Sequence, residues 1–205
     1  MVTKLKRQII VEGEDNKEKL GLVHVITGDG RGKTTSAVGL ALRAIGYGYK
    51  VYMIQFLKSG KTGEILAVKS LPNITIEQYG VDALNNAKPQ KTLFDFQSSG
   101  TQFVFQPDIE ERKACQRAME KAKEIINSKE YDIIILDEIN CALDKGLIKI
   151  EEAKKLIENH GHTELILTGR DVPKEIMELA DYVSNIERIK HPWQKGIKAR
   201  RGIEY

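Results

Sequence analysis

Short hydrophobic runs alternate with helical patterns along most of this chain. The runs Leu22–Thr27, Lys50–Phe56 and Tyr131–Glu138 are rich in β-branched and aromatic residues and have the length of strands. Residues 33–45 place alanine and leucine at helical spacing, and Gly46 follows as a stop signal. The same criteria predict further strands at Asn73–Tyr79, Glu164–Thr168 and Tyr182–Ile189, and further helices at Asp108–Ser128, Ile150–Asn159 and Pro173–Ala180.

Continuous hydrophobic strands that alternate with helices are typical of a parallel sheet with helices on both faces. We therefore predict an α/β fold, with one domain over residues 21–205 and a mostly parallel sheet flanked by helices on both faces. Residues 1–20 are polar and mixed in charge, which indicates an N-terminal appendage. Residues 80–102 have little periodicity and predict a long loop, a kind of segment that is usually functional or disordered.

The composition narrows the class of protein. The chain has 205 residues, of which 41% are hydrophobic and 30% charged, and this balance argues against disorder. No hydrophobic run approaches the roughly 18–20 residues needed to cross a bilayer, and the first residues lack the pattern of a secretory signal. Two cysteines do not make a disulfide framework. We expect a cytoplasmic protein without a membrane partner.

Positive charge gathers near the end of the sequence. The net charge is +3, yet residues 188–205 hold six Lys or Arg and one Glu. Such a patch is able to bind a polyanion, which opens the hypothesis of a nucleotide-dependent nucleic-acid binder, or it is simply a solvated tail. Because aromatic residues do not alternate with these charges, we do not expect nucleic acid as a partner.

A glycine-rich segment between the first strand and the first helix carries the clearest chemical signal. Glycines there allow backbone N–H groups to face an anion, and the helix N-terminus adds partial positive charge. Lys33 is expected to reach phosphate oxygens, and the Thr34 hydroxyl to bind Mg²⁺. The loop is shorter than usual, because Thr27 stands where the first glycine of the common motif belongs. The predicted nucleotide-binding residues are Gly28, Asp29, Gly30, Arg31, Gly32, Lys33, Thr34 and Thr35.

Two carboxylates, Asp137 and Glu138, follow the hydrophobic run of the clearest strand. A strand end near a phosphate-binding loop delivers carboxylates to Mg²⁺, so this pair is a candidate second metal anchor. Glu138 is also a candidate base that activates water or an acceptor hydroxyl, as in a P-loop ATPase or kinase. The products discriminate these functions, since hydrolysis or phosphoryl transfer yields phosphate or ADP.

Three segments carry a resemblance to a known family. The stretches TGDGRGKTTSAVGLALRAIGYGYKVYMIQFLK, YDIIILDEIN and ILTGRDVPKEIMELADYVSNIERIKHPWQKGIKARRGIEY resemble the P-loop class of ATP:cob(I)alamin (corrinoid) adenosyltransferases. The similarity covers residues 21–205 and includes the short loop. It implies a P-loop domain that transfers the 5′-deoxyadenosyl group of ATP to Co(I) of a corrinoid and releases triphosphate. Cobalt is then the nucleophile, so no general base is required.

The resemblance also implies roles for particular residues. Lys33 and Arg31 would hold phosphates, Thr34 and Glu138 would hold Mg²⁺, and Asp137 would support the metal site. Further ligands of the nucleotide or of the metal surroundings are expected at Lys58, Asn140 and Arg170.

The resemblance also bears on the reduction of the corrinoid and on protein partners. In this family an aromatic-x-aromatic pair is thought to exclude the lower axial ligand of Co(II), which makes reduction to Co(I) easier. Phe103 and Phe105 match that position, with Phe94 and Phe96 as a competing pair, and core-filling aromatics are the alternative. The resemblance further implies a flavoprotein reductase as electron donor and a homodimer in which residues 1–20 cap an active site.

Overall fold

The computed structural model describes residues 17–81 and 109–205. Within these residues six strands form one sheet in the order β3-β2-β4-β5-β1-β6, and every neighbouring pair is parallel. This confirms the predicted α/β fold with a parallel sheet. The strands are β1 (Val23–Thr27), β2 (Val51–Phe56), β3 (Ile74–Tyr79), β4 (Ile133–Asp137), β5 (Glu164–Thr168) and β6 (Tyr182–Asn185).

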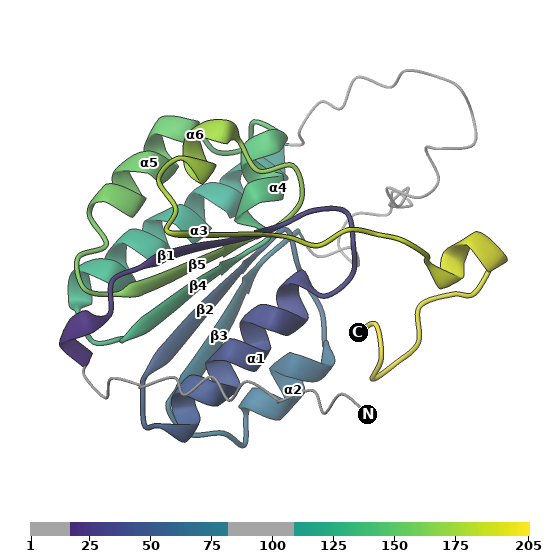
Figure 1. The fold of residues 1–205 in the computed structure, drawn as a ribbon, viewed down its shortest axis with the longest axis horizontal. Coiled ribbons are helices and arrows are strands. Elements are labelled where there is room, and N and C mark those ends of the chain that lie inside the picture. Colours follow the sequence, from purple (N-terminus) through teal and green to yellow (C-terminus); the bar gives the residue numbers. More distant parts are fainter. Residues whose placement is uncertain (1–16, 82–108) are drawn as a thin grey trace, which may run out of the picture.

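Helices cover both faces of the sheet, as expected. Figure 1 shows α1 and α2 on one side and α3, α4, α5 and α6 on the other. The described helices are α1 (Lys33–Gly46), α2 (Gly63–Val68), α3 (Ile109–Ser128), α4 (Ile139–Asp144), α5 (Ile150–Glu158) and α6 (Lys174–Met177), with short 3₁₀ turns at Lys17–Lys19 and Pro192–Lys195. Among these described helices, none is long and apolar enough to cross a membrane.

Two hydrophobic clusters lie on opposite faces of the sheet. On one face Ala37 and Ala41 of α1 pack against Met53 and Ile135. On the other face α3, α4, α5 and α6 pack over the alternate positions of the same strands, among them Ile54. Every residue of β2 and β4 is therefore buried. Burial on both faces explains why these strands read as continuous hydrophobic runs.

The structure differs from the sequence-based prediction in its shorter elements. The helices α2 and α4 were not predicted, because six residues carry too little periodicity to separate a helix from a loop. The strand expected over Tyr182–Ile189 ends at Asn185, and the Ile186 carbonyl that follows accepts a hydrogen bond from Gly30 N at 2.7 Å. The predicted long loop and most of the appendage lie outside the described residues.

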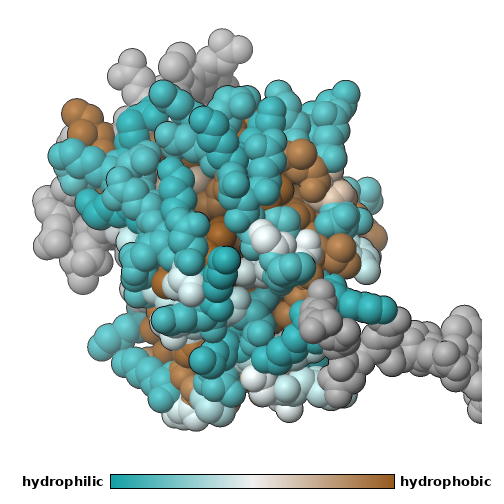
Figure 2. Space-filling view, turned by 90° about the vertical axis from the view of Figure 1, so that its left-hand side faces the viewer, coloured by the Kyte–Doolittle hydropathy of each residue, from teal (hydrophilic) through white to brown (hydrophobic). Residues whose placement is uncertain are grey.

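Parallel strands place their carboxyl ends at one edge of the sheet, and this edge gathers the chemically interesting residues. β5 lies between β1 and β4, so the segments that follow these three strands are neighbours. The opposite side of the molecule, which the amino ends of the strands approach, is mainly hydrophilic, with hydrophobic side chains in separate small patches (Figure 2). Ligands of open α/β sheets bind outside the carboxyl ends, which makes that edge the candidate site.

Candidate active site

The glycine-rich loop (Gly28–Thr35) joins β1 to α1 and lies tightly against the chain that follows β6. Gly28 has a φ of 100°, and a Cβ there would lie 2.3 Å from the Ile186 carbonyl oxygen. A Cβ on Gly30 would lie 2.7 Å from the carbonyl oxygens of Ile186 and Glu187. These glycines are therefore required by close backbone packing as well as by the turn itself.

Replacing Gly30 by alanine is expected to destabilise the fold by about 1–3 kcal/mol, because the new Cβ meets backbone that cannot rotate away. Thermal unfolding and ATP binding are the measurements, and both should fall. Gly63→Ala is the matched control, since a Cβ at Gly63 meets nothing within 4 Å. Equal behaviour of the two variants would show that the loop does not depend on this close approach.

Lys33 curls back over the glycine-rich loop. Its Nζ donates hydrogen bonds of 2.7 Å to the carbonyl oxygens of Gly28 and Gly30, and the residue is 7% exposed. Burial lowers the pKa of Lys33, with a further lowering from the neighbouring Arg170. The ammonium is thus held against the loop at which phosphate oxygens are expected to bind.

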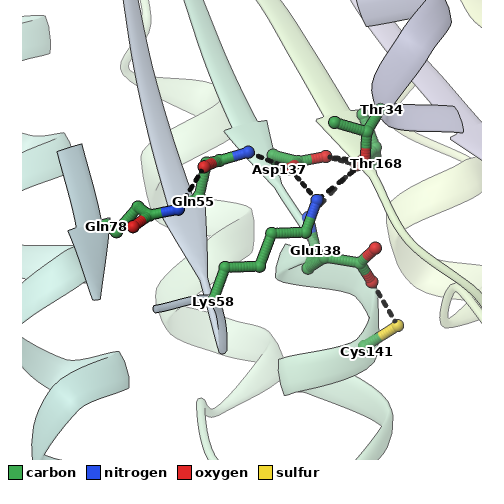
Figure 3. A network of polar contacts seen from close by, with 8 residues as sticks. All are labelled: Thr34, Gln55, Lys58, Gln78, Asp137, Glu138, Cys141 and Thr168. Carbon is green, nitrogen blue, oxygen red and sulfur yellow. Dashed lines mark hydrogen bonds and ion pairs between the residues drawn. The ribbon is translucent and has the colours of Figure 1, made fainter. Parts of the chain in front are cut away.

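Asp137 is the centre of a buried polar network (Figure 3). It is fully buried, and each of its carboxylate oxygens accepts two hydrogen bonds. Oδ1 accepts from the hydroxyls of Thr34 at 2.9 Å and Thr168 at 2.6 Å. Oδ2 accepts from Gln55 Nε2 at 2.9 Å and from Lys58 Nζ at 2.7 Å. The network joins α1, β2 and β5 around the end of β4.

Three members of this network were not singled out from the sequence. Gln55 and Thr168 lie at the ends of β2 and β5, and Gln78 of β3 extends the network by donating to Gln55 Oε1 at 3.0 Å. All three are polar residues near the ends of hydrophobic strands, which is the signal that could have found them. Lys58, by contrast, was singled out from the sequence, and its Nζ donates to Asp137 and to Thr34 in this network.

Glu138 sits in a strained backbone position beside the network. Its φ of 64° places it in the left-handed region, which glycine favours over other residues. Its N–H donates to Thr168 Oγ1 at 3.1 Å. Its carboxylate accepts from the thiol of Cys141 at 2.9 Å, and burial together with Glu138 raises the pKa of that thiol to about 12. Cys141 is therefore a protonated donor that fixes Glu138.

Arg170 and Asn140 have different surroundings, although both were expected to bind. Arg170 lines a cavity of about 310 Å³ together with Glu138 and much of the glycine-rich loop. Asn140 is fully buried, and its Nδ2 donates to the Gly169 carbonyl at 3.4 Å. Its Oδ1 has no hydrogen-bond partner among the described residues. In this structure Asn140 lies behind the site and does not line that cavity.

The last residues of the sequence form a wall of the site. Arg31 donates a hydrogen bond to the Ile203 carbonyl and lies 3.9 Å from the Glu204 carboxylate. Arg200 also binds Glu204 and lowers the pKa of this carboxyl to about 2. Glu204 lines the 310 Å³ cavity and two adjoining cavities of about 350 and 360 Å³. Glu204 was not predicted as a site residue, because residues 188–205 look only like a positively charged patch in the sequence.

The oxygen donors at this edge fit a divalent cation that prefers hard ligands. The Thr34 hydroxyl and the carboxylates of Asp137 and Glu138 are donors of the kind that Mg²⁺ uses, with further positions filled by water or substrate phosphate. The Lys58 ammonium already lies between Asp137 and Thr34, so the place accepts positive charge. Residues 17–81 and 109–205 contain no cluster of three or more His, Cys, Asp or Glu side chains that could hold a metal ion.

A parallel sheet with a glycine-rich loop, two carboxylates and basic side chains at its carboxyl edge is typical of nucleotide-binding α/β proteins. Comparison with known proteins gives the family. The model of the ATP:corrinoid adenosyltransferase BtuR/CobO/CobP family matches residues 19–205, and the chain belongs to this family.

Curated relatives agree with this assignment over nearly their whole length. The chain is similar to the corrinoid adenosyltransferase of Escherichia coli K12, with 29% identity over 98% of this chain and 94% of the relative. It is 33% identical to a corrinoid adenosyltransferase of Sinorhizobium sp, over 98% of this chain and 86% of the relative. The corrinoid adenosyltransferase CobA of Salmonella typhimurium LT2 is 30% identical, over 98% and 94%. The resemblance stated from the sequence is confirmed.

Proposed function

We propose that this enzyme transfers the 5′-deoxyadenosyl group of ATP to Co(I) of a corrinoid and releases triphosphate. Cobalt supplies the electron pair of the new bond to C5′. The bond between C5′ and the triphosphate oxygen breaks, and triphosphate leaves with the electron pair of the broken bond. The observation that carries the proposal is that the glycine-rich loop and Glu138 line one cavity in a member of this family, with the Asp137 carboxylate buried beside it and hydrogen-bonded to Thr34.

Different residues of the site would bind the phosphate oxygens and the metal ion of the leaving triphosphate. Lys33 and Arg31 bind phosphate oxygens, for which Lys33 exchanges its carbonyl partners in the loop. Thr34, Asp137 and Glu138 would hold Mg²⁺, which supplies positive charge for the leaving group. Arg170 faces the same cavity and adds a further positive charge. Positioning and charge neutralisation are sufficient, since cobalt needs no general base.

The test is an assay with ATP, Mg²⁺ and chemically reduced cobalamin. The visible spectrum reports the cobalt–carbon product, and chromatography of the nucleotide products separates triphosphate from phosphate and ADP. Stoichiometric alkylated corrinoid and triphosphate are the expected result. Phosphate or ADP without alkylated corrinoid would instead establish the ATPase or kinase function in which Glu138 activates water or a hydroxyl.

The aromatic pair gives a prediction about the reduction step. Phe103 and Phe105 lie outside the described residues, so their role rests on the family resemblance. Replacing both by alanine is expected to lower turnover from Co(II) with a flavoprotein reductase far more than turnover from pre-formed Co(I). Both rates are measured on the same variant, and Phe94→Ala with Phe96→Ala is the matched comparison. Equal losses from Co(II) and Co(I) would show that Phe103 and Phe105 fill the core.

The proposal includes the setting that the family implies. A flavoprotein reductase would supply the electron, and a homodimer would bring residues 1–20 of one copy to the other. We also propose a cytoplasmic location, on the grounds of the hydrophobic runs, first residues and cysteine content of the sequence.

A further inference from the structure

Lys58 holds the two side chains at which a divalent cation is expected. Its Nζ lies 2.7 Å from Asp137 Oδ2 and 2.9 Å from Thr34 Oγ1. Figure 3 shows the long side chain reaching from the end of β2 to this point, with the ammonium between the carboxylate and the hydroxyl. One ammonium thus contacts both proposed oxygen ligands.

The buried carboxylate of Asp137 needs a positive partner at all times. Asp137 is fully buried, whereas the Lys58 side chain is 26% exposed. A buried carboxylate without a positive partner is strongly unfavourable, so the fold needs Lys58 when no other cation is present. An ammonium and Mg²⁺ would compete for the same oxygen atoms and would repel each other.

The side chain of Lys58 is able to leave while its backbone stays in place. A Cβ on Gly80 would lie 2.5 Å from the carbonyl carbon and oxygen of Lys58, so the segment after β2 is tightly packed against the end of β3. The side chain, in contrast, borders two open cavities of about 350 and 360 Å³. These cavities adjoin the one lined by the glycine-rich loop and share Glu204 with it.

We propose that Lys58 is a positioning residue that occupies the cation site in the metal-free enzyme and is displaced when the divalent cation enters. Metal binding is then an exchange of one cation for another. The released ammonium turns into the adjoining cavities, where triphosphate oxygens can accept it. This inference rests on the metal site of the proposed function and adds the mechanism by which that site is kept formed before the metal arrives.

Two consequences can be measured without turnover. First, metal-free wild-type enzyme needs no divalent cation for its stability, because Asp137 already has a positive partner. Second, a variant without the Lys58 ammonium leaves the Asp137 carboxylate without a positive partner. The stability of this variant should therefore depend on a divalent cation. Mn²⁺ is a suitable probe for both, because it takes the same oxygen ligands as Mg²⁺ and is detected by its paramagnetic signal.

The experiment compares wild type with Lys58→Met, which keeps the length of the side chain and removes its charge. Thermal unfolding is measured without nucleotide, with and without MnCl₂. We expect Lys58→Met to unfold about 3–8 °C below wild type and to regain most of this loss in Mn²⁺, while wild type barely responds. Lys61→Met, an exposed lysine three positions further on, is the matched control and should behave as wild type.

Direct titration gives a second readout. The signal of free Mn²⁺ is followed while protein is added. We expect Mn²⁺ to bind Lys58→Met at least about tenfold more tightly than it binds wild type. Adding Asp137→Asn to Lys58→Met should abolish the response to Mn²⁺. If Lys58→Met does not fold, Lys58→Gln is used with the same titration. Equal Mn²⁺ affinity of wild type and the Lys58 variant, or a Lys58 variant whose unfolding temperature and Mn²⁺ response match wild type, would overturn the proposal.

The outcome is independent of adenosyl transfer, because neither ATP nor corrinoid is present. A Mn²⁺-dependent Lys58→Met together with no alkylated corrinoid would refute the proposed function alone. Normal product formation together with a Lys58→Met that ignores Mn²⁺ would refute the exchange of cations alone.

Discussion

Lys33→Ala is expected to lower the rate of adenosyl transfer by about 10²–10³ at saturating ATP, because one charged contact to the leaving triphosphate is lost. The loss should appear in kcat as well as in kcat/KM, since negative charge grows on the triphosphate as its bond to C5′ breaks. Single-turnover rates with pre-formed Co(I) measure the effect on the chemical step itself.

The structure also predicts a side effect of this substitution. Lys33 donates to the Gly28 and Gly30 carbonyls, so alanine leaves these oxygens without their ammonium donor. Unfolding temperature must therefore be followed beside the rate. Lys61→Ala is the control, because Lys61 is exposed, whereas Lys58 contacts Asp137 and Thr34 in the site. Near-normal turnover of folded Lys33→Ala would contradict phosphate binding by the glycine-rich loop.

Asp137→Asn is the second substitution with a large expected effect, and it acts on stability. The carboxylate accepts four hydrogen bonds, two at each oxygen. An amide has only one oxygen, so its NH₂ group must face two of the present donors, and the Lys58 ammonium loses its charged partner. We expect a loss of about 3 kcal/mol in the free energy of unfolding.

For a domain of this size such a loss corresponds to a fall of roughly 6–12 °C in unfolding temperature. Asp144→Asn, at the exposed end of α4, is the matched control and should unfold as wild type does. The same variants also report on Mg²⁺, because Asp137→Asn should require more of the metal for half-maximal activity. An Asp137→Asn protein as stable as Asp144→Asn would refute a central structural role for this carboxylate.

The sequence predicts the fold and the centre of the site because both depend on local patterns. The hydrophobic run before Asp137 is continuous because β4 is buried on both faces, and the same run marks the carboxylates as the end of a strand. Gly28 and Gly30 signal a loop that approaches other backbone closely, and the structure identifies the carbonyl of Ile186 as the partner.

Other parts of the site depend on the order of the strands, which periodicity does not reveal. Thr168 reaches Asp137 because β5 lies between β1 and β4, so a residue from a third strand end completes the network. Glu204 reaches Arg31 across most of the length of the sequence, through a tail whose regular structure is one short 3₁₀ turn. The sequence also does not reveal that Asn140, in the first turn of α4, is buried, so its expected contact with the nucleotide or the metal surroundings stays a prediction.

The position of β1 in the sheet also constrains the order in which the chain folds. β2 pairs with β3, the next strand in sequence, and with β4, whereas β1 pairs only with β5 and β6 among the described strands. Val23 N donates to Asp181 across 158 residues of sequence. During synthesis β1 therefore has no partner strand until β5 has left the ribosome. A nascent chain stopped before β5 would leave the edges of β1 unpaired, and an unpaired strand edge promotes aggregation.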